Sequence, residues 1–260
     1  DLITRQSYVR IETEAAAHAA HCVFTTPGAA QDYRQRYPDA ASRMVVLENG
    51  YDEESFASAS PADARRPSSQ SGPLILLHSG IIYPAERDPT QLFVALQRLR
   101  NAGTIRPADV RIRFRASVHD DLLQSLAATH GVKDFIELCP AIPYREALAE
   151  MMTVDALLVM QASNCNAQIP AKIYEYLRAG RPIIGLTDPV GDTAAVMRTA
   201  GLHAIARLDS VEEIVTLLPN FVASARSGQM QLPTVAAVQQ ASRQNRAEVL
   251  AALFNSVAAG

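Results

Sequence analysis

The stretch QIPAKIYEYLRAGRPIIGL, from Gln168 to Leu186, decides the fold expected for this chain. Its pattern predicts a loop, a short helix, a stop and a buried strand. Pro170 suits the first turn of a helix, where the N–H group that proline lacks would have no partner anyway. Gly180 stands where a helix end favours a left-handed residue, and Pro182 cannot extend the helix. The run Ile183–Leu186 then predicts an interior strand.

Apolar and charged side chains fall on different sides of this predicted helix. Ile173, Tyr176 and Leu177 form the apolar side, whereas Lys172 and Glu175 are three residues apart and share another face. Lys172 and the N–H groups at the helix start would attract phosphate, and Glu175 could accept hydrogen bonds from two vicinal ribose hydroxyls. The pattern therefore fits a nucleotide-diphosphate site. The alternative is a solvated helix whose Lys–Glu pair contributes a few tenths of a kcal/mol.

Strand and helix patterns alternate around this stretch from residue 73 onward. Besides the elements above, strands are expected at 74–77, 110–114, 134–138, 154–160 and 204–206, and helices at 89–99, 118–129, 143–152, 192–200, 211–223 and 235–258. Asp88 is the expected N-cap of the first of these helices, and Leu250, Leu253 and Phe254 are the expected apolar side of the last. Such alternation predicts a Rossmann-like α/β domain, a parallel sheet with helices on both faces.

The first residues of the chain predict a partial second α/β domain. A helix is expected at 5–20, strands at 21–26 and 44–47, and a helix from about 28 to 37 between the strands. The run ASASPADARRPSSQSG, residues 57–72, is rich in Ala, Ser and Pro and lacks periodicity, which is typical of a linker. We therefore divide the chain into residues 1–58, a linker at 59–72, and a domain at 73–260 that ends in a long closing helix, 235–258.

Composition bounds the function. The 260 residues are 48% hydrophobic and carry a net charge of -3, which argues against a nucleic-acid-binding surface. Cys22, Cys139 and Cys165 form no CxxC spacing, so neither a metal site nor a disulfide framework is predicted, and a reducing, cytoplasmic setting is expected. No apolar run approaches 18 residues. Because the chain begins at Asp1, we expect it to be a fragment or a processed product.

Candidate ligand contacts follow the first predicted strand of the larger domain. Ligands of open α/β sheets bind outside the carboxyl ends of the strands. Gly80 there would let the backbone approach a diphosphate, and Arg87 could hold phosphate oxygens, although Gly80 could be a simple turn and Arg87 a surface residue. His78 is the best placed of the six histidines, at this strand end.

Other candidates lie on later turns. Pro143 and Tyr144 open the helix after the third strand, as ligand contacts or as a simple helix start. Asn164, Asn166 and Gln168 precede the central helix, where they could bind sugar hydroxyls or serve as turn residues.

The central motif resembles the donor-site signature of retaining glycosyltransferase family 4, in the branch that reads "iPaKlyEYLaaGrPii". Two further segments are similar to that branch, SGIIYPAERDP from residue 79 and LCPAIPYREALAEMMTVDALLVMQ from residue 138. The order and spacing of these loose motifs extend from about Glu14 to Ala258. Glu175 matches the second glutamate of the family's Glu–seven residues–Glu motif, whereas Ala167, which has no carboxylate to offer a donor sugar, stands at the first.

The resemblance implies the GT-B architecture, with residues 73–260 as the nucleotide-sugar-binding domain and 1–58 as a remnant of the acceptor-side domain and hinge. It implies transfer of a hexosyl group from a nucleotide-diphospho-sugar to a hydroxyl acceptor, with retention, in bacterial polysaccharide or lipopolysaccharide assembly. Arg87, Lys172 and Glu175 would be the catalytic residues. Gly80, Arg87, Pro143, Tyr144, Gln168, Lys172 and Glu175 would bind the donor, with Pro143 and Tyr144 at the base. No metal or cofactor would be needed.

Several expectations about partners accompany this hypothesis. The acceptor would be a carbohydrate or a lipid-linked molecule, with a peripheral position at the inner face of the membrane left open. The first 56 residues would leave apolar surface for pairing with a second copy, and the fragment alone could be inactive. Two rivals remain: a non-catalytic α/β nucleotide-binding or interaction module, and a nucleotide-sugar epimerase, for which the chain shows no cluster of carboxylates and histidine.

Overall fold

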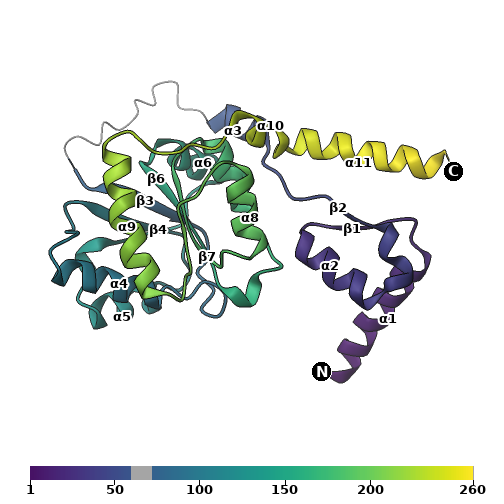
Figure 1. Ribbon diagram of the computed structural model, residues 1–260, viewed down its shortest axis with the longest axis horizontal. Helices are drawn as coiled ribbons and strands as arrows, with labels where there is room; N and C mark the ends of the chain where they lie inside the picture. The colour runs from purple at the N-terminus through teal and green to yellow at the C-terminus, as the bar shows by residue number, and fades with distance from the viewer. Residues whose placement is uncertain (60–71, 260) are drawn as a thin grey trace.

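The computed structural model describes residues 1–59 and 72–259 as an α/β protein with two parallel sheets (Figure 1). The larger sheet has the strand order β5-β4-β3-β6-β7-β8, and every neighbouring pair in it is parallel. Its strands are β3 Leu74–Ser79, β4 Val110–Arg115, β5 Ile136–Cys139, β6 Ala156–Gln161, β7 Ile183–Thr187 and β8 Ile205–Ala206. This confirms the predicted Rossmann-like fold class.

Helices cover both faces of this sheet and enclose two apolar cores (Figure 1). One face lies under α4 Thr90–Asn101, α5 Asp120–Thr129 and α9 Val211–Arg226. The other lies under α6 Tyr144–Thr153, α7 Lys172–Ala179 and α8 Asp192–Thr199. The central strands are apolar throughout because they are covered on both sides: every residue of β6 and β7 is buried.

The expected element bounds shift at several helix and strand starts. Helix α4 begins at Thr90 and not at Pro89, although Asp88 Oδ1 still accepts the Thr90 N–H at 2.9 Å. Helix α5 begins two residues later than predicted, because Val118 has a φ of 67° that no right-handed helix contains. The expected strand start at 134 is wrong, since η2, Lys133–Phe135, is a 3-10 turn ahead of β5. A similar short turn, η3 Ser163–Cys165, follows β6.

The first unit is small and lies beside the unit that contains the larger sheet (Figure 1). It contains α1 Leu2–His18, β1 Cys22–Phe24, α2 Pro27–Arg36, η1 Pro38–Arg43 and β2 Met44–Val46, with β1 and β2 parallel. Helix α3, Glu53–Ala59, follows, and its Phe56 is fully buried in the core beneath α6 and α7. This helix extends three residues into the stretch expected to be irregular. The rest of the predicted linker, residues 60–71, lies outside the described residues.

The single long helix expected at 235–258 is wrong, because the chain breaks into α10 Val235–Gln240 and α11 Arg243–Ala258. The backbone of Tyr51 causes the break: its N–H donates to Ala241 O at 3.1 Å and its carbonyl accepts from Arg243 N at 2.8 Å. Ser242 then caps α11 through Asn245 N. Helix α11 extends past the larger unit without a buried residue, so its expected apolar side does not close the domain (Figure 1).

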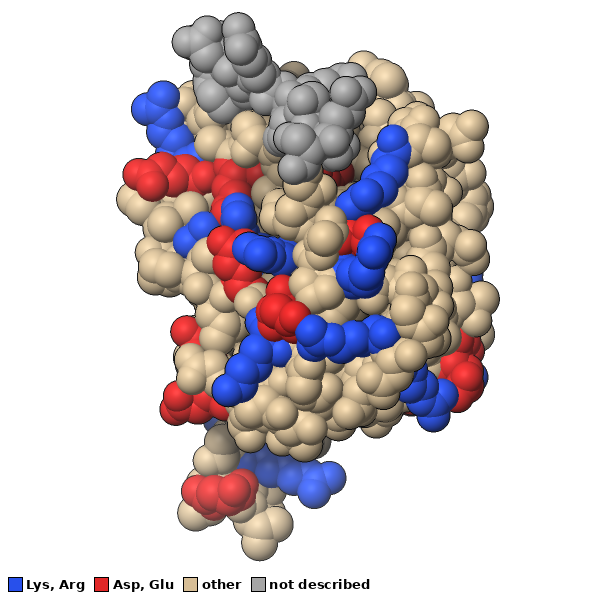
Figure 2. Space-filling view, turned by 90° about the vertical axis from the view of Figure 1, so that its left-hand side faces the viewer, with Lys and Arg blue, Asp and Glu red and all other residues tan. Residues whose placement is uncertain are grey.

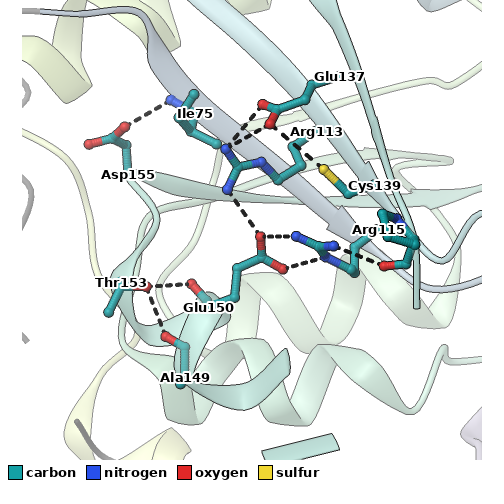
Figure 3. A network of polar contacts seen from close by, with 10 residues as sticks. Ile75, Arg113, Arg115, Glu137, Cys139, Ala149, Glu150, Thr153 and Asp155 are labelled. Atoms are coloured by element: carbon teal, nitrogen blue, oxygen red, sulfur yellow. Dashed lines mark hydrogen bonds and ion pairs between the residues drawn. The ribbon is translucent and has the colours of Figure 1, made fainter. Parts of the chain in front are cut away.

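An ion network ties α6 to the edge of the larger sheet (Figure 3). Arg115 pairs bidentately with Glu150, from Nε to Oε2 and from Nη2 to Oε1, each at 2.8 Å. Arg113 joins Glu150 and Glu137, both at 3.0 Å. Burial pushes the pKa of Glu150 up, but hydrogen bonds and charge from Arg115 and Arg113 outweigh it and leave this pKa below its ordinary value. The carboxylates of Glu137 and Glu150 are both engaged by a guanidinium, which indicates a structural role.

Charged side chains of both signs lie interspersed over the face at which α4 and α5 lie, as Figure 2 shows. None of the helices in the described part of the chain combines the length and the apolar character that a membrane crossing requires. Among those same residues, no group of three or more histidine, cysteine or carboxylate side chains is placed to hold a metal ion.

Candidate functional site

The larger sheet reverses its strand order between β3 and β6. The chain builds outward from β3 to β5 and then returns to place β6 on the other side of β3. Such a switch point opens a crevice outside the carboxyl ends of the two strands, where ligands of doubly wound sheets bind. The loop after β3 carries Gly80 and Arg87, and the loop after β6 leads into Lys172. Sequence positions far apart therefore meet at this crevice.

Lys172 is the first residue of α7 and reaches back to the end of β3. Its Nζ donates to Ser79 O at 2.5 Å and lies 3.4 Å from His78 Nε2. Burial, and after it the positive charge of Arg87, lowers the pKa of Lys172 to about 7. The site therefore holds a lysine that is poised to take up a proton when negative charge arrives. Lys172 is one of two lysines in the chain; the other, Lys133, is exposed.

His78 lies beneath the crevice on β3 and is completely buried. Its Nδ1–H donates to Leu158 O of β6 at 3.0 Å, so Nε2 is left as an acceptor that faces the ammonium of Lys172. Burial and the charge of Lys172 hold the pKa of His78 well below its ordinary value. His78 therefore serves as a neutral support for Lys172, and it has no open path to a ligand.

Gly80 has a φ of +122°, a backbone conformation that side-chain-bearing residues rarely adopt. A Cβ atom there would also collide with Lys172 Nζ and lie 3.3 Å from Lys172 Cε. Its N–H donates to Arg115 O at 2.8 Å. The predicted close approach is present, and in this structure the approaching group is the lysine side chain.

Arg87 borders the same crevice from the loop before α4. Its Nη1 donates to Ile81 O at 3.0 Å, and its guanidinium lies over the Tyr83 ring at 5.1 Å. Its Nε is buried without a hydrogen-bond partner among the described residues. The charge of Arg87 contributes to the low pKa values of both Lys172 and His78. Arg87 and Lys172 thus form a cationic pair. Within the described residues neither forms an ion pair with a carboxylate, and the charge of Glu175 only partly offsets the lowering of the Lys172 pKa.

Glu175 and Tyr144 meet across the gap between α6 and α7. Tyr144 Oη donates to Glu175 Oε1 at 2.7 Å. Partial burial of the phenol, although the residue as a whole is exposed, and after it this hydrogen bond, raises the pKa of Tyr144. Tyr144 begins α6 directly after Pro143, and both residues are exposed. The structure therefore brings Tyr144 to Glu175, a contact that no local sequence pattern indicates.

The loop before α7 is held mainly by backbone contacts. Within the described residues, Gln168 forms its hydrogen bonds through the backbone, with Cys165 O and with the Thr193 hydroxyl, and its side chain is exposed. Asn164 Nδ2 donates to Ala85 O at 2.9 Å, and Asn166 Nδ2 donates to Asp188 Oδ2 at 2.7 Å. Both asparagines thus tie this loop to distant segments of the chain, Asn164 to the loop after β3 and Asn166 to the loop after β7.

The first unit touches this loop at Ala167. Thr26 Oγ1 donates to Ala167 O at 2.7 Å, and Gly28 N donates to Asp192 Oδ2 at 2.7 Å. A Cβ atom on Gly28 would lie 2.8 Å from Ala167 Cβ, so the two segments are in direct contact. Sequence reasoning missed Thr26 and Gly28, because nothing local shows which loop they meet. A cavity of about 380 Å³ lies behind the loop, lined by Glu48, Tyr174 and Arg246 among others, and does not include Lys172 or Glu175.

Comparisons with known proteins identify the fold. No family model and no curated protein matches the chain. Solved structures do match. The chain has the GT-B fold. A trehalose 6-phosphate synthase from Burkholderia multivorans is 15% identical with a TM-score of 0.67, over 96% of this chain and 62% of that one.

Two other matches carry informative descriptions. WaaG, a glycosyltransferase involved in lipopolysaccharide biosynthesis, is 16% identical with a TM-score of 0.62, over 84% of this chain and 57% of that one. HepE of Anabaena, in complex with UDP-glucose, is 14% identical with a TM-score of 0.60, over 95% of this chain and 68% of that one. The chain thus spans about three fifths of the length of most of these structures. At such identities the likeness establishes the fold.

Proposed function

We propose that this chain is the donor-binding part of a glycosyltransferase that uses a nucleotide-diphospho-sugar. The observation that carries the proposal is the position of Lys172, which begins α7 at the switch point and contacts the end of β3 beside Gly80. A helix start, a lysine and a guanidinium then converge where doubly wound sheets bind nucleotides. The GT-B fold of the chain and the UDP-glucose bound to the Anabaena structure support this assignment.

The chemistry follows from charge. Glycosyl transfer breaks the bond between the anomeric carbon and the diphosphate and forms a bond from that carbon to an acceptor oxygen, whose proton is released. Negative charge therefore develops on the departing diphosphate. Arg87 and Lys172, with the N–H groups of the α7 start, would stabilise that charge. Glu175, one helical turn further, would bind the ribose.

Finer features are also part of the proposal. The resemblance to family 4 supports transfer of a hexosyl group with retention, to a hydroxyl acceptor, in polysaccharide or lipopolysaccharide assembly. Ala167 has no carboxylate to offer a donor sugar, and its carbonyl is engaged by Thr26. We infer that the sugar is bound by groups other than a residue-167 side chain. Pro143, Tyr144 and Gln168 remain proposed donor contacts, and the acceptor groups belong to parts of the protein outside this crevice.

Calorimetric titration with UDP and with GDP tests the proposal. We expect saturable binding of one of them, weakened about 10- to 100-fold by Lys172→Met, which removes a charge-assisted contact while keeping a half-buried side chain of similar length. Arg87→Gln should weaken binding in the same direction. The matched control is Lys133→Gln, which removes the other, exposed lysine and should leave the affinity unchanged.

The outcomes are decisive. Binding that is insensitive to Lys172→Met would place the nucleotide elsewhere and overturn the assignment of this crevice. Failure of the unaltered chain to bind either nucleotide would overturn the proposal and favour a non-catalytic interaction module, since α/β sheets of this kind host many functions.

A further inference from the structure

The hydroxyl of Tyr144 and the carboxylate of Glu175 form a pair that can only accept further hydrogen bonds. Tyr144 has donated its single proton to Glu175 Oε1 at 2.7 Å. Its oxygen then retains acceptor capacity alone, and the carboxylate keeps Oε2 and the remaining lone pairs of Oε1. Any ligand that fits this pair must bring donors.

The direction of that hydrogen bond holds near neutral pH. Partial burial of the phenol, and after it the hydrogen bond to Glu175, raises the pKa of Tyr144. The phenol therefore stays protonated wherever the protein is folded at neutral pH, and it keeps its proton on the side of the carboxylate. The pair is fixed as an acceptor surface, not as a site that alternates between donor and acceptor.

The place of the pair along α7 indicates what would supply the donors. Glu175 lies three residues after Lys172, so the two side chains share one side of the helix about 4.5 Å apart along its axis. In a nucleoside diphosphate, the ribose is directly attached to the phosphates. If the diphosphate lies at Lys172, the ribose reaches Glu175 and its 2′- and 3′-hydroxyls are two adjacent donors.

We propose that Tyr144 is a specificity-determining residue that, with Glu175, selects ligands carrying a vicinal diol, and so ribonucleoside over 2′-deoxyribonucleoside diphosphates. This inference rests on the proposed function. Tyr144 keeps the Glu175 carboxylate turned toward α6. The Tyr144 oxygen also accepts a hydrogen bond from a second ligand hydroxyl, which without Tyr144 would be bonded to water. A ligand without one of the hydroxyls leaves an acceptor of the pair unmatched, and a site built for a hydroxyl discriminates against the analogue that lacks it.

The rival explanation is that Tyr144 merely fastens α6 to α7. If the hydrogen bond only fastens the two helices, its loss would lower the stability of the fold and so reduce the affinity for all ligands equally. If the Tyr144 hydroxyl selects the diol, its loss would reduce the affinity only for the ligand that carries the second hydroxyl. The two explanations therefore differ in the ratio of two affinities, which is independent of the fraction of folded protein.

The test is calorimetric titration with UDP, GDP and the 2′-deoxy analogue of each, on the unaltered chain and on Tyr144→Phe. The matched control is Tyr37→Phe, because Tyr37 also donates to a glutamate, Glu12 Oε1, at 2.8 Å, in the first unit. We expect the unaltered chain to prefer the ribonucleotide about tenfold over its deoxy analogue, as one hydrogen bond to a charged pair allows. In Tyr144→Phe the ribonucleotide should bind about three- to tenfold more weakly and the deoxy analogue within twofold of its original affinity. Tyr37→Phe should leave both affinities unchanged.

Each other outcome overturns the inference in a recognisable way. If Tyr144→Phe keeps the full preference for the ribonucleotide, the diol is selected without Tyr144, while the proposed function stands. If both ligands weaken equally, the hydroxyl is only a fastening contact. If the unaltered chain binds no nucleotide at all, the proposed function fails and this inference fails with it.

Discussion

The larger unit and the first unit bury very different amounts of apolar side chain. In the larger unit, two apolar cores cover both faces of a six-stranded sheet. In the first unit, the buried members of the apolar cluster are only Ala16, Ala40 and Met44, and α1 exposes Leu2, Ile3 and Tyr8. The free energy that stabilises the two units must therefore have different sources.

Polar contacts replace a core in the first unit. Glu12 on α1 accepts hydrogen bonds from Tyr33 at 2.9 Å, Tyr37 at 2.8 Å and Arg36 at 2.5 Å. Arg43 donates to the carbonyls at the end of α1, including Ala16 O at 2.7 Å. The stability from such contacts depends on charge and on hydrogen-bond geometry, whereas the stability from apolar burial depends on the area removed from water. The comparison teaches that the larger unit should respond to lost volume and the first unit to lost charge.

The sharpest test of the comparison is a pair of truncations. Phe114 is fully buried, with its ring centroid 6.1 Å from His78 and 6.4 Å from Phe93. We expect Phe114→Ala to lower the free energy of unfolding by about 3–5 kcal/mol, and Met44→Ala, in the small cluster, by about 2 kcal/mol. Urea unfolding followed by circular dichroism measures both. Equal costs would show that the first unit has a core of its own.

The second test is the pH dependence of nucleotide binding, because the larger unit holds Lys172 in a partly buried position without an ion-pair partner among the described residues. Lys172 has a pKa of about 7 in the free protein, lowered by burial and then by Arg87. A diphosphate would restore the proton, so binding should take up a proton, and the affinity should fall by up to about tenfold per pH unit above pH 7. For folding the sign is opposite: between about pH 7 and the ordinary value of 10.5, the unfolded chain binds the proton and the folded chain does not, so stability rises with pH there.

Titration at pH 8 in two buffers of different ionisation enthalpy measures the proton uptake directly. In Lys172→Met the uptake should vanish, and the remaining affinity should not vary with pH near 8. Uptake that persists in this variant would assign the proton to another group. It would also remove the contrast between Lys172, which has no ion-pair partner among the described residues, and the paired charges around Glu12 in the first unit.

The sequence predicts the larger unit well because most of its helices and strands have a recognisable local residue pattern. The apolar runs of β6 and β7, the left-handed Gly180 at 66° and the buried side of α7 all follow from local residues. Besides small shifts of element starts, the failures depend on distant segments. The break between α10 and α11 is made by the backbone of Tyr51, which no pattern near residue 241 reveals.

The candidate site shows the same division. Residue type and position predict Gly80 and Arg87 in the loop after one strand and Lys172 at the start of the central helix, and the strand order brings them together. The contact of Lys172 with His78 requires knowledge that β3 and β6 are neighbours, and the contact of Tyr144 with Glu175 requires the packing of α6 on α7. In the first unit nothing local marks Glu12 as the partner of three side chains, because a glutamate on an exposed helix usually faces water.

The smallest expected effect concerns Glu12 and would complete the comparison. Burial pushes the pKa of Glu12 up, but hydrogen bonds from Arg36, Tyr37 and Tyr33 outweigh it, and the pKa lies below its ordinary value of 4.5. The stability that this carboxylate contributes is therefore present above about pH 4.5 and is lost as the pH falls through the lower, folded-state pKa. We expect α1 to loosen in acid before the larger unit does.

Glu12→Gln should reproduce part of this loosening at pH 7, by about 1 kcal/mol, because an amide accepts these hydrogen bonds more weakly than a carboxylate. Hydrogen exchange of the α1 peptide, read by mass spectrometry, measures it apart from the larger unit. Glu14→Gln is the matched control on the same helix. Glu14 is exposed, and its ion pair with Arg10 is long, at 4.0 Å from Oε1 to Arg10 Nε. Faster exchange in both variants would mean that α1 responds to any lost charge. Unchanged exchange in Glu12→Gln would mean that the small apolar cluster, and not the carboxylate, holds α1 in place.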